Sequence, residues 1–524
     1  MFVLDELRIN FLMLLIIISL FFLAFFQRSL IRIFFPNFIG FDTYYHLFWG
    51  NAIRKNKFKI PKENDRLIIG KKHNYPYLYH LILSIFPKKF CNKYVERFLN
   101  PFIDTIFTCI IFLISHHLTN SLKQSFFISI MYIFTPIMFS AQSTGPRINS
   151  ATPRVLGEVL TNLVFMLEFI YIVKTKNFIL IACPIILSSL AFLSSKFSLQ
   201  ALFFVSIFFL LNTFNFFPLI IFILGMICAF LVSKGRYYDI LKTQLTHLRY
   251  VFLFTLKERK IPHLSQRNSF ILLIKSFKIS LVEIWKNLLF NNSFTIIIIK
   301  FPLFLGSIYY LIVTPPINNY LLYSKAFIIS GILIYLLTSL KPLLFLGEAE
   351  RYLLHISYFI FFYLSFYISD KIIFYFVIPY GIFFQILDII YISIVKKHSP
   401  THKYTDELIK YLNNIRGIKN VLTVPFHLAG GWRIIYDTPH NWFYFEDYSN
   451  EERKKLKEII LEYPIINLEK FDYFVEKYDI DIVLIEKKKL KEKFKGFKIP
   501  DNFKQSSIDD EVLILEKQKN ISYD

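Results

Sequence analysis

The sequence predicts an α-helical membrane domain of about eleven spans, followed by a small α/β domain. Three observations support this fold class. Of the 524 residues, 55% are hydrophobic and 19% aromatic, with a mean hydropathy of +0.46, whereas soluble proteins average about 45–50% apolar residues. The apolar residues come in blocks of about 18–22, enough to cross a hydrocarbon core of about 30 Å. After Val395 the chain is rich in charge and has no further spanning run.

The membrane domain is expected to cover residues 1–395. Its first apolar run ends Phe25-Phe26-Gln27-Arg28, without the small residues of a cleavage site, so it is interpreted as a retained span. The stretch 269–290 carries too many charges to span and is expected to lie on the membrane as an amphipathic helix. The predicted spans are 9–27, 101–118, 125–142, 157–173, 177–194, 197–213, 215–233, 293–313, 325–341, 352–369 and 372–395.

Residues 396–524 are predicted to form an extracytoplasmic α/β domain, because short apolar runs typical of strands alternate with helical patterns. Its length is sufficient for a core of its own. The expected strands and helices are Asn420–Phe426, Asp481–Glu486 and Glu511–Glu516 as strands, and Asp406–Ile415 and Leu468–Tyr478 as helices.

The chain carries a formal net charge of +22 and four cysteines. The basic residues crowd the loops beside predicted spans, which indicates contact with anionic lipid head groups or a basic cavity for a phosphate-bearing substrate. We expect membrane lipids and not nucleic acid as partners. The cysteines form no CxxC pair, so a disulfide framework or a zinc site is not expected.

Alternation of the spans places all long loops on one face. With a cytoplasmic N-terminus, the outer face receives the C-terminal domain and the loops 28–100, 143–156, 234–292 and 342–351. These outer loops hold more Lys and Arg than the positive-inside rule favours, but inverting the protein would still leave them together. We therefore expect a multi-pass protein of the plasma membrane with an active site on the outer face.

The first polar cluster, Gly40-Phe-Asp42-Thr-Tyr-Tyr45-His46, follows the first span. A carboxylate at this interface can act as a general base or hold a divalent metal. His46 lies four residues after Asp42 and would share its helix face. The alternative is that Asp42 is merely the N-cap of a short interfacial helix.

The second cluster extends from Ser143 to Glu158 and contains Arg147 and Arg154. Arginine forks suit phosphate oxygens. Glu158 would lie one turn inside the helix that Arg154 begins. Snorkelling arginines over a solvated loop are the alternative.

The third cluster is Gly347-Glu348-Ala-Glu350-Arg351-Tyr352, directly before a predicted span. Its acids and its arginine would bind a sugar phosphate or order one another as ion pairs. An ordinary helix start with acids in its first turn is the alternative.

The first cluster resembles the acidic first-loop segment of the GT-C superfamily of membrane glycosyltransferases, especially the catalytic subunits of archaeal-type oligosaccharyltransferases and their relatives. Thr152-Pro-Arg154-x-x-Gly157-Glu158 and Gly347-Glu348-Ala-Glu-Arg351-Tyr are similar to later motifs of GT-C proteins. The likeness covers the layout of the whole chain.

The resemblance implies transfer of a sugar from a polyprenyl- or dolichyl-phosphate-linked donor to an acceptor, which could be a glycan, a lipid or a protein. Asp42 would be the catalytic carboxylate, as a base or as a ligand of Mg²⁺ or Mn²⁺, with His46 as its catalytic neighbour. The residues implied in substrate binding are Tyr45, Arg147, Arg154, Glu158, Glu348 and Arg351.

The chain departs from the oligosaccharyltransferase pattern in two places. It lacks the Trp-Trp-Asp-Tyr-Gly motif, for which Gly430-Gly431-Trp432-Arg433 is too different to substitute, and the loop 143–156 has no Asp-x-Asp. Protein N-glycosylation and metal dependence therefore stay open. A transporter or flippase for a lipid-linked or anionic substrate is one rival, although no internal repeat is visible. A non-catalytic membrane receptor is another.

Overall fold

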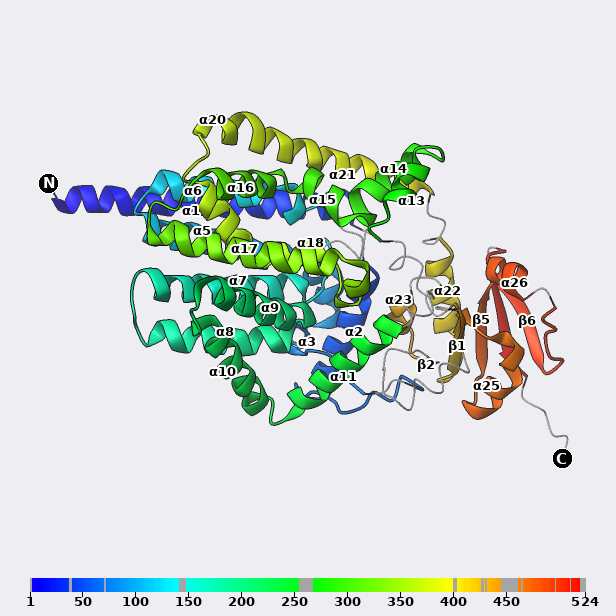
Figure 1. Cartoon of the computed structure of the whole chain (residues 1–524). Helices are drawn as coiled ribbons and strands as arrows, with labels where there is room; N and C mark the ends of the chain where they lie inside the picture. The colour runs from blue at the N-terminus through cyan, green and yellow to red at the C-terminus, as the bar shows by residue number, and fades with distance from the viewer. Residues whose placement is uncertain are drawn as a thin grey trace.

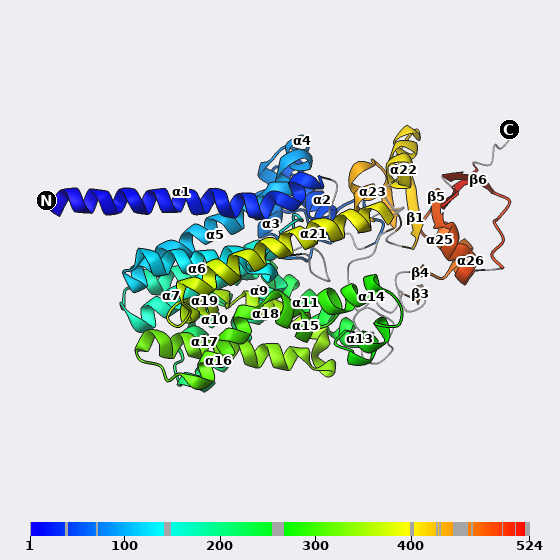
Figure 2. The same ribbon diagram turned by 90° about the horizontal axis from the view of Figure 1, so that it is seen from above.

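A computed structural model describes residues 2–36, 40–69, 72–140, 148–253, 267–398, 403–425, 428, 431–443, 460–462, 465–494, 496–508 and 510–518. Figures 1 and 2 show a bundle of helices with the N-terminus at one end and the strands of the C-terminal region at the other.

The helical part extends from α1 to α21. Its longer helices are α1 (Phe2–Phe34), α2 (Phe41–Lys55), α3 (Leu78–Ile85), α5 (Glu96–Thr119), α6 (Leu122–Phe134), α7 (Arg154–Val173), α8 (Ile179–Ser194), α9 (Lys196–Thr213), α10 (Phe217–Val232), α11 (Arg236–Phe252), α15 (Ser293–Lys300), α16 (Pro302–Val313), α17 (Asn319–Ser339), α19 (Ser357–Leu364) and α21 (Ile378–His398). Shorter turns join them: α4 (Lys88–Phe90), η1 (Cys91–Val95), η2 (Pro136–Met138), α13 (Phe270–Ser276), α14 (Leu281–Lys286), η4 (Asn287–Asn291), η5 (Lys341–Leu346), α18 (Ala349–Leu354), α20 (Asp370–Ile372) and η6 (Ile373–Val377).

Within the described ranges, six helices are long and apolar enough to cross a membrane, and eight if each of two sharply bent pairs is one span. The bent pairs are α10 with α11, at 119°, and α15 with α16, at 89°. The multi-pass helical architecture is thus as predicted, but the number of about eleven spans is not confirmed. The reason is length, since α6 and α8 are apolar but have only 13 and 16 residues.

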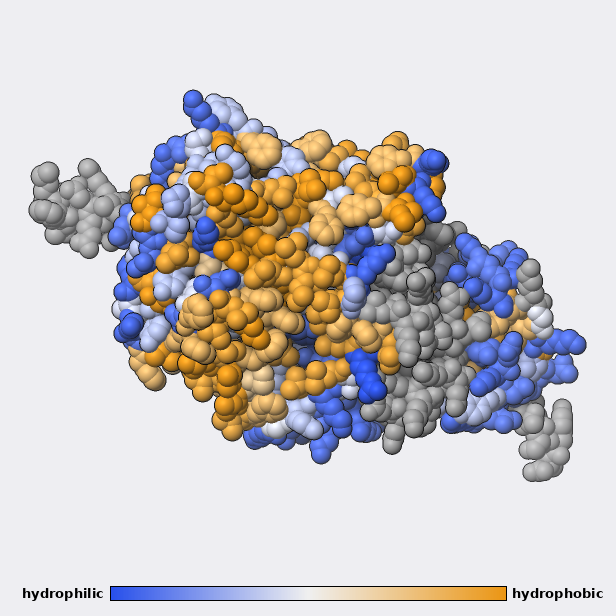
Figure 3. All heavy atoms as spheres, viewed as in Figure 1, coloured by the Kyte–Doolittle hydropathy of each residue, from blue (hydrophilic) through white to orange (hydrophobic). Residues whose placement is uncertain are grey.

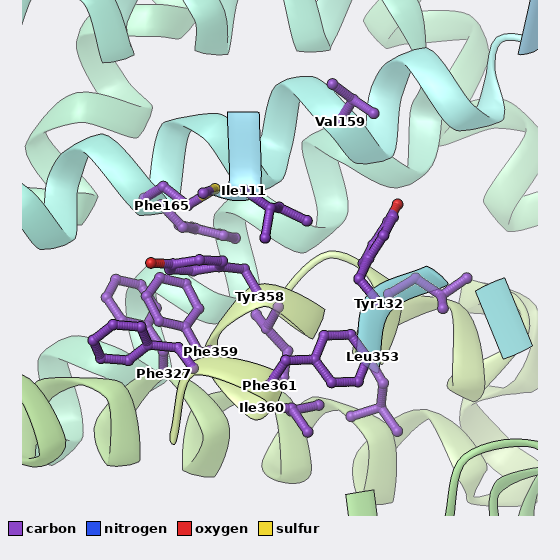
Figure 4. Close-up of a cluster of buried hydrophobic side chains, with 14 of the residues drawn as sticks. Ile111, Tyr132, Val159, Phe165, Phe327, Leu353, Tyr358, Phe359, Ile360 and Phe361 are labelled. Carbon is purple, nitrogen blue, oxygen red and sulfur yellow. The ribbon is translucent and has the colours of Figure 1, made fainter. Parts of the chain in front are cut away.

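The centre of the bundle is an aromatic core around α19, all of whose residues are buried. The Phe327 and Phe359 rings stack with centroids 4.2 Å apart, and Phe169 meets Phe359 edge-on at 5.4 Å. Figure 4 shows this cluster, in which side chains from several helices converge. A helix that is hydrophobic on all sides belongs inside a bundle. The apolar run at 352–369 is therefore explained by the buried position of α19.

Hydrophobic side chains also cover the outside of the bundle. In Figure 3 they form a broad zone over the helices, with hydrophilic residues towards both ends. Exposed aliphatic and aromatic residues on α1, α10 and α21 belong to this surface, which suits lipid as a solvent. The stretch 269–290 forms the short helices α13 and α14 and the turn η4 instead of one continuous amphipathic helix.

A buried ion pair ties α1, α5 and α6 together. Arg28 Nε of α1 lies 2.6 Å from Asp104 Oδ2 of α5, and Tyr132 of α6 donates to Asp104 Oδ1 at 2.6 Å. Both side chains of the pair are fully buried. Asp104, which lies inside the predicted span 101–118, therefore has a structural partner.

The C-terminal region contains a five-stranded sheet in the order β2-β1-β5-β7-β6. Strand β1 is parallel to β2 and β5, whereas β7 is antiparallel to β5 and β6. The predicted strands correspond to β1, β5 and β7; the short β2 and the polar β6 were not anticipated. The bounds are β1 (Asn420–Val424), β2 (Asn441–Phe443), β5 (Ile482–Glu486), β6 (Phe503–Ile508) and β7 (Val512–Lys517), with a separate pair β3 (Ile460–Glu462) and β4 (Ile465–Ile466), and helices α22 (Lys403–Asn414), α23 (Trp432–Asp437), η9 (Leu468–Lys470), α25 (Phe471–Lys477) and α26 (Lys487–Lys493).

The first long loop extends this sheet at its β2 edge. Trp442 donates its backbone N–H to the carbonyl of Arg66 at 2.8 Å, and Ile68 donates to the carbonyl of Trp442 at 2.9 Å. The Arg66 guanidinium also donates to the backbone carbonyls of Ile435, Thr438 and His440. The loop after α1 and the C-terminal region therefore share one core.

Candidate active site

Helix α2 carries the first predicted cluster. Gly40 is its N-cap, and the Gly40 backbone N–H donates to Ser150 Oγ at 3.0 Å. Asp42 lies in the first turn, where the helix dipole favours a carboxylate. The interpretation of Asp42 as the N-cap is wrong, because Gly40 holds that position. Ser150 also brings the second cluster's segment against the start of α2.

The Asp42 carboxylate faces Arg351. Its side chain is exposed, yet burial by the surrounding protein raises its pKa, and the Arg351 charge acts in the opposite direction. Both facts hold for a carboxylate that water reaches from one side while protein encloses it on the others. The structure thus brings the first and third predicted clusters together.

Arg351 is held in place by two contacts. Its guanidinium carbon lies 4.6 Å above the Phe197 ring, and its Nε forms an ion pair with Glu348. Phe197 also packs on Gly347, where an added Cβ would lie only 2.4 Å from the ring, and Gly347 has a φ of +113°. Glycine is therefore required for this turn on both steric and conformational grounds.

A second arginine, Arg267, completes this ion-pair network. Arg267 Nη1 lies 3.3 Å from Glu348 Oε1, and Arg267 Nη2 pairs with Glu350. Ser293 Oγ of α15 donates to Glu350 Oε2 at 2.9 Å. Glu348 is thus shared between Arg267 and Arg351. Sequence reasoning missed Arg267, because no motif surrounds it and its partners lie more than 80 positions away.

The second cluster also contains an arginine paired with a glutamate. Arg154 Nε lies 3.1 Å from Glu158 Oε1, one turn along α7, and Glu158 is only 2% exposed. Gly157 lets α7 approach α9, since an added Cβ would lie 2.5 Å from atoms of Ser195 and Ser198. Arg147 lies outside the described residues.

Tyr45 and His46 turn inward from α2. Tyr45 is 9% exposed and meets Trp432 of α23 with ring centroids 4.9 Å apart, while the guanidinium of Arg433 lies 6.0 Å from the Tyr44 ring. The segment dismissed as too different from the oligosaccharyltransferase motif therefore packs directly on the helix of Asp42.

His46 belongs to a cluster of three histidines that sequence reasoning missed. His46 Nδ1 lies 2.8 Å from His80 Nε2, and His80 Nδ1 lies 2.9 Å from His73 Nε2. His73 precedes α3 and His80 lies within it. The Tyr75 ring packs on His46 and His80, and Lys196, at the start of α9, lies 5.1 Å from that ring. The one available signal was two histidines in the same loop.

The part of the chain that the structure describes contains no group of three His, Cys, Asp or Glu side chains that could hold a metal ion. The positive charge of Arg351 acts on the Asp42 carboxylate, and a nearby cation weakens the attraction of a carboxylate for a metal ion. Dependence on Mg²⁺ or Mn²⁺ stays a prediction, and no step below depends on such an ion.

The fold of this chain, a helical bundle followed by a C-terminal sheet, is similar to that of several solved structures. One is ArnT from Cupriavidus metallidurans bound to undecaprenyl phosphate, with a TM-score of 0.54, 8% identity and 97% coverage of each chain. Its apo form has a TM-score of 0.55.

Another is the archaeal oligosaccharyltransferase AglB from Archaeoglobus fulgidus, in complex with an inhibitory peptide and a dolichol-phosphate. It has a TM-score of 0.54 and 10% identity, and the match covers 92% of this chain and 70% of AglB. No family model and no curated protein sequence matches the chain. At sequence identities this low, the structural matches establish a shared fold, and the reaction has to be argued from the site.

Proposed function

We propose that the protein is a membrane glycosyltransferase that moves a sugar from a polyprenyl- or dolichyl-phosphate-linked donor to an acceptor on the outer face of the membrane. The fold supports the class of enzyme. The lipid phosphates bound by ArnT and AglB support the class of donor.

The observation that carries the proposal is the setting of Asp42. It is an accessible carboxylate next to a long first helix, its pKa is raised by burial, and an arginine lies beside it. A raised pKa strengthens a carboxylate as a base. We assign Asp42 the role of general base.

The arginines of the site suit a phosphate leaving group. Arg351 uses Nε for Glu348, and a guanidinium has four further N–H donors on its two terminal nitrogens. Glu348 would orient Arg351 so that these nitrogens donate to phosphate oxygens in a forked geometry. Arg154, which pairs with Glu158, is proposed as a second phosphate ligand. Arg147 is proposed as a third phosphate ligand on its sequence alone.

The proposed reaction is a single displacement. Asp42 accepts the proton of the acceptor hydroxyl or amide, and the freed electron pair forms the new bond to the anomeric carbon of the sugar. The bond from that carbon to the lipid phosphate oxygen breaks, and its electron pair stays on the phosphate. Arg351 and Arg154 would stabilise the resulting negative charge, which is the usual part of positioned cations in such transfers.

The test is transfer by purified protein in lipid nanodiscs, using a panel of labelled polyprenyl- and dolichyl-phosphate sugars with candidate glycan, lipid and peptide acceptors. Asp42→Asn keeps the size of the side chain and removes the base. We expect transfer to fall by about 10²–10⁴-fold, the range for loss of a general base. The same assay with EDTA, Mg²⁺ or Mn²⁺ tests metal dependence.

A matched control is Asp370→Asn. Asp370 lies on α20, far from α2 in Figure 1, and pairs with Lys123 at 2.5 Å. It should leave transfer unchanged. If Asp42→Asn is as active as the wild type, Asp42 is not the base. If the wild type instead carries a labelled lipid-linked sugar across the bilayer without forming a product, the protein is a flippase and the proposal is wrong.

A further inference from the structure

Two arginines and two glutamates around the start of α18 form one buried ion-pair network. Glu348 contacts a different arginine with each of its carboxylate oxygens: Oε1 lies 3.3 Å from Arg267 Nη1, and Oε2 pairs with Arg351 Nε. Arg267 Nη2 pairs with Glu350. The two positive charges of these side chains are therefore balanced by two negative ones, and Arg267 and Arg351 are joined through one shared carboxylate.

The Arg267 end of the network is anchored to α15 and α17. The Arg267 side chain is only 4% exposed. Asn268, the next residue, accepts from the Ser293 backbone N–H at 2.8 Å and donates to the Ser339 carbonyl at 3.1 Å. Ser293 begins α15 and Ser339 ends α17. These contacts fix the position from which Arg267 reaches Glu348.

The Arg351 end differs in what its nitrogens contact. The Arg351 side chain is 11% exposed, its Nε pairs with Glu348, and its guanidinium lies over the Phe197 ring. Within the described ranges its terminal nitrogens, Nη1 and Nη2, have no hydrogen-bond partner. Arg267 instead directs both of its terminal nitrogens at glutamates. Because a guanidinium binds phosphate through paired N–H groups, Arg351 is the member of the network that can receive an anion.

The shared carboxylate determines how Arg351 is oriented. An arginine side chain has many rotamers, and an anion that binds it must select one of them at an entropic cost. The ion pair with Glu348 makes this selection in advance, provided that Glu348 is itself fixed. Glu348 is 2% exposed, and Arg267 holds its other oxygen. Without Arg267 the Glu348 carboxylate could turn, and Arg351 would turn with it.

We propose that Arg267 is a positioning residue, which holds Glu348 so that the terminal nitrogens of Arg351 are already arranged to bind the phosphate of the lipid-linked donor. Arg267 does not contact the phosphate in this assignment, since glutamates occupy both of its terminal nitrogens. The inference deepens the proposed function and rests on it for the identity of the ligand.

The test is a double-mutant cycle on the binding of radiolabelled polyprenyl phosphate, without sugar, to purified protein in lipid nanodiscs. Arg267→Gln/Glu350→Gln removes one charge of each sign, so Glu348 loses its anchor while the charge balance of the network is kept. Arg351→Gln removes the phosphate ligand. We expect Arg351→Gln to weaken binding by about 10–100-fold, the effect of losing a hydrogen bond to a charged group. The charge-balanced pair should weaken it by about tenfold, as for other partners that orient a binding group.

Combining the substitutions separates positioning from direct contact. In the Arg351→Gln background the charge-balanced pair should have no further effect, because Arg267 acts only through Arg351. Losses that multiply would show that Arg267 contacts the phosphate itself or that the pair disturbs the fold, and either would refute the positioning role. Polyprenol, which lacks the phosphate, should bind equally to every variant. Arg416→Gln, at an exposed arginine of the C-terminal region, is the matched control and should bind polyprenyl phosphate like the wild type.

A second variant keeps the test decisive. If the charge-balanced pair does not fold, Arg267→Lys replaces it in the cycle, because one ammonium nitrogen keeps the charge but cannot reproduce both contacts of the guanidinium. The binding assay needs no sugar transfer. Coupled losses in a protein that transfers no sugar would therefore contradict the proposed function and retain the positioning role. Unchanged binding in Arg351→Gln would overturn the inference even in a protein that transfers sugar.

Discussion

Acidification should destabilise the protein through the three buried histidines. Burial lowers the pKa of His46 and His73 well below the ordinary value and that of His80 to about 3, whereas an unfolded histidine titrates near 6.5. The unfolded chain therefore takes up protons below pH 6.5 that the folded chain refuses, and stability falls with pH until the folded pKa is reached. From pH 7.5 to 5 this amounts to about 2 kcal/mol per histidine, or about 6 kcal/mol for the three.

Tryptophan fluorescence is a suitable assay, because Trp49 of α2 packs on His73 and Trp432 packs on Phe48 of the same helix. Denaturant midpoints would be measured at pH 7.5, 6 and 5 for the wild type and for His80→Gln. Removing one histidine should remove about 2 kcal/mol of the acid-induced loss. Carboxyl groups whose pKa is raised, such as Asp42, act with the opposite sign, and they cancel in the comparison of the two proteins. Equal pH dependence in both would refute the reasoning.

Substitutions at three further contacts test the packing. Asp104→Asn should cost about 3–5 kcal/mol by leaving Arg28 buried and unpaired, whereas the double variant Arg28→Met/Asp104→Leu should recover most of that loss; thermal stability in detergent measures both. Gly381→Ala should destabilise by about 1–3 kcal/mol in the same assay, because its Cβ would lie 2.4 Å from a carbonyl oxygen of α6. The matched Gly306→Ala, with its nearest atom at 3.9 Å, should be neutral or slightly stabilising. Arg66→Lys replaces the planar guanidinium by a single ammonium nitrogen, which cannot reproduce the geometry of the three carbonyl contacts, and should hasten proteolytic release of the C-terminal region.

Apolar runs located the helices well, because hydrophobicity is a local property of the sequence. The strand at Asn420 was equally clear, since its residues are apolar and buried. The number of spans was less accessible: whether α15 and α16 form one crossing depends on a bend of 89°, and the buried position of α19 depends on what surrounds it. The polar strand β6 carried no hydrophobic signal and exists because it pairs with β7.

The same distinction between local sequence patterns and distant contacts applies to the candidate site. Asp42 and Arg351 stood in recognisable clusters, and the structure brings them together. Arg267 and His80 could not be found, because their roles depend on partners 81 and 34 positions away. Arg351 was predicted to bind a phosphate directly. The sequence left open, as the alternative, that the residues of its cluster form ion pairs with one another, as Arg351 does with Glu348. Spacing within a motif indicates chemistry, whereas contacts between distant segments decide which groups share it.

The pairing of the first loop with the C-terminal sheet has a consequence for synthesis. Arg66 reaches partners as late as His440, 374 positions further along the chain, which a ribosome adds in about 20–75 seconds at about 5–20 residues per second. During that interval the loop beside α2 has no strand to pair with, and Leu67, 2% exposed in the finished protein, is uncovered. The helix that bears Asp42 is therefore supported last, when the C-terminal region has been added.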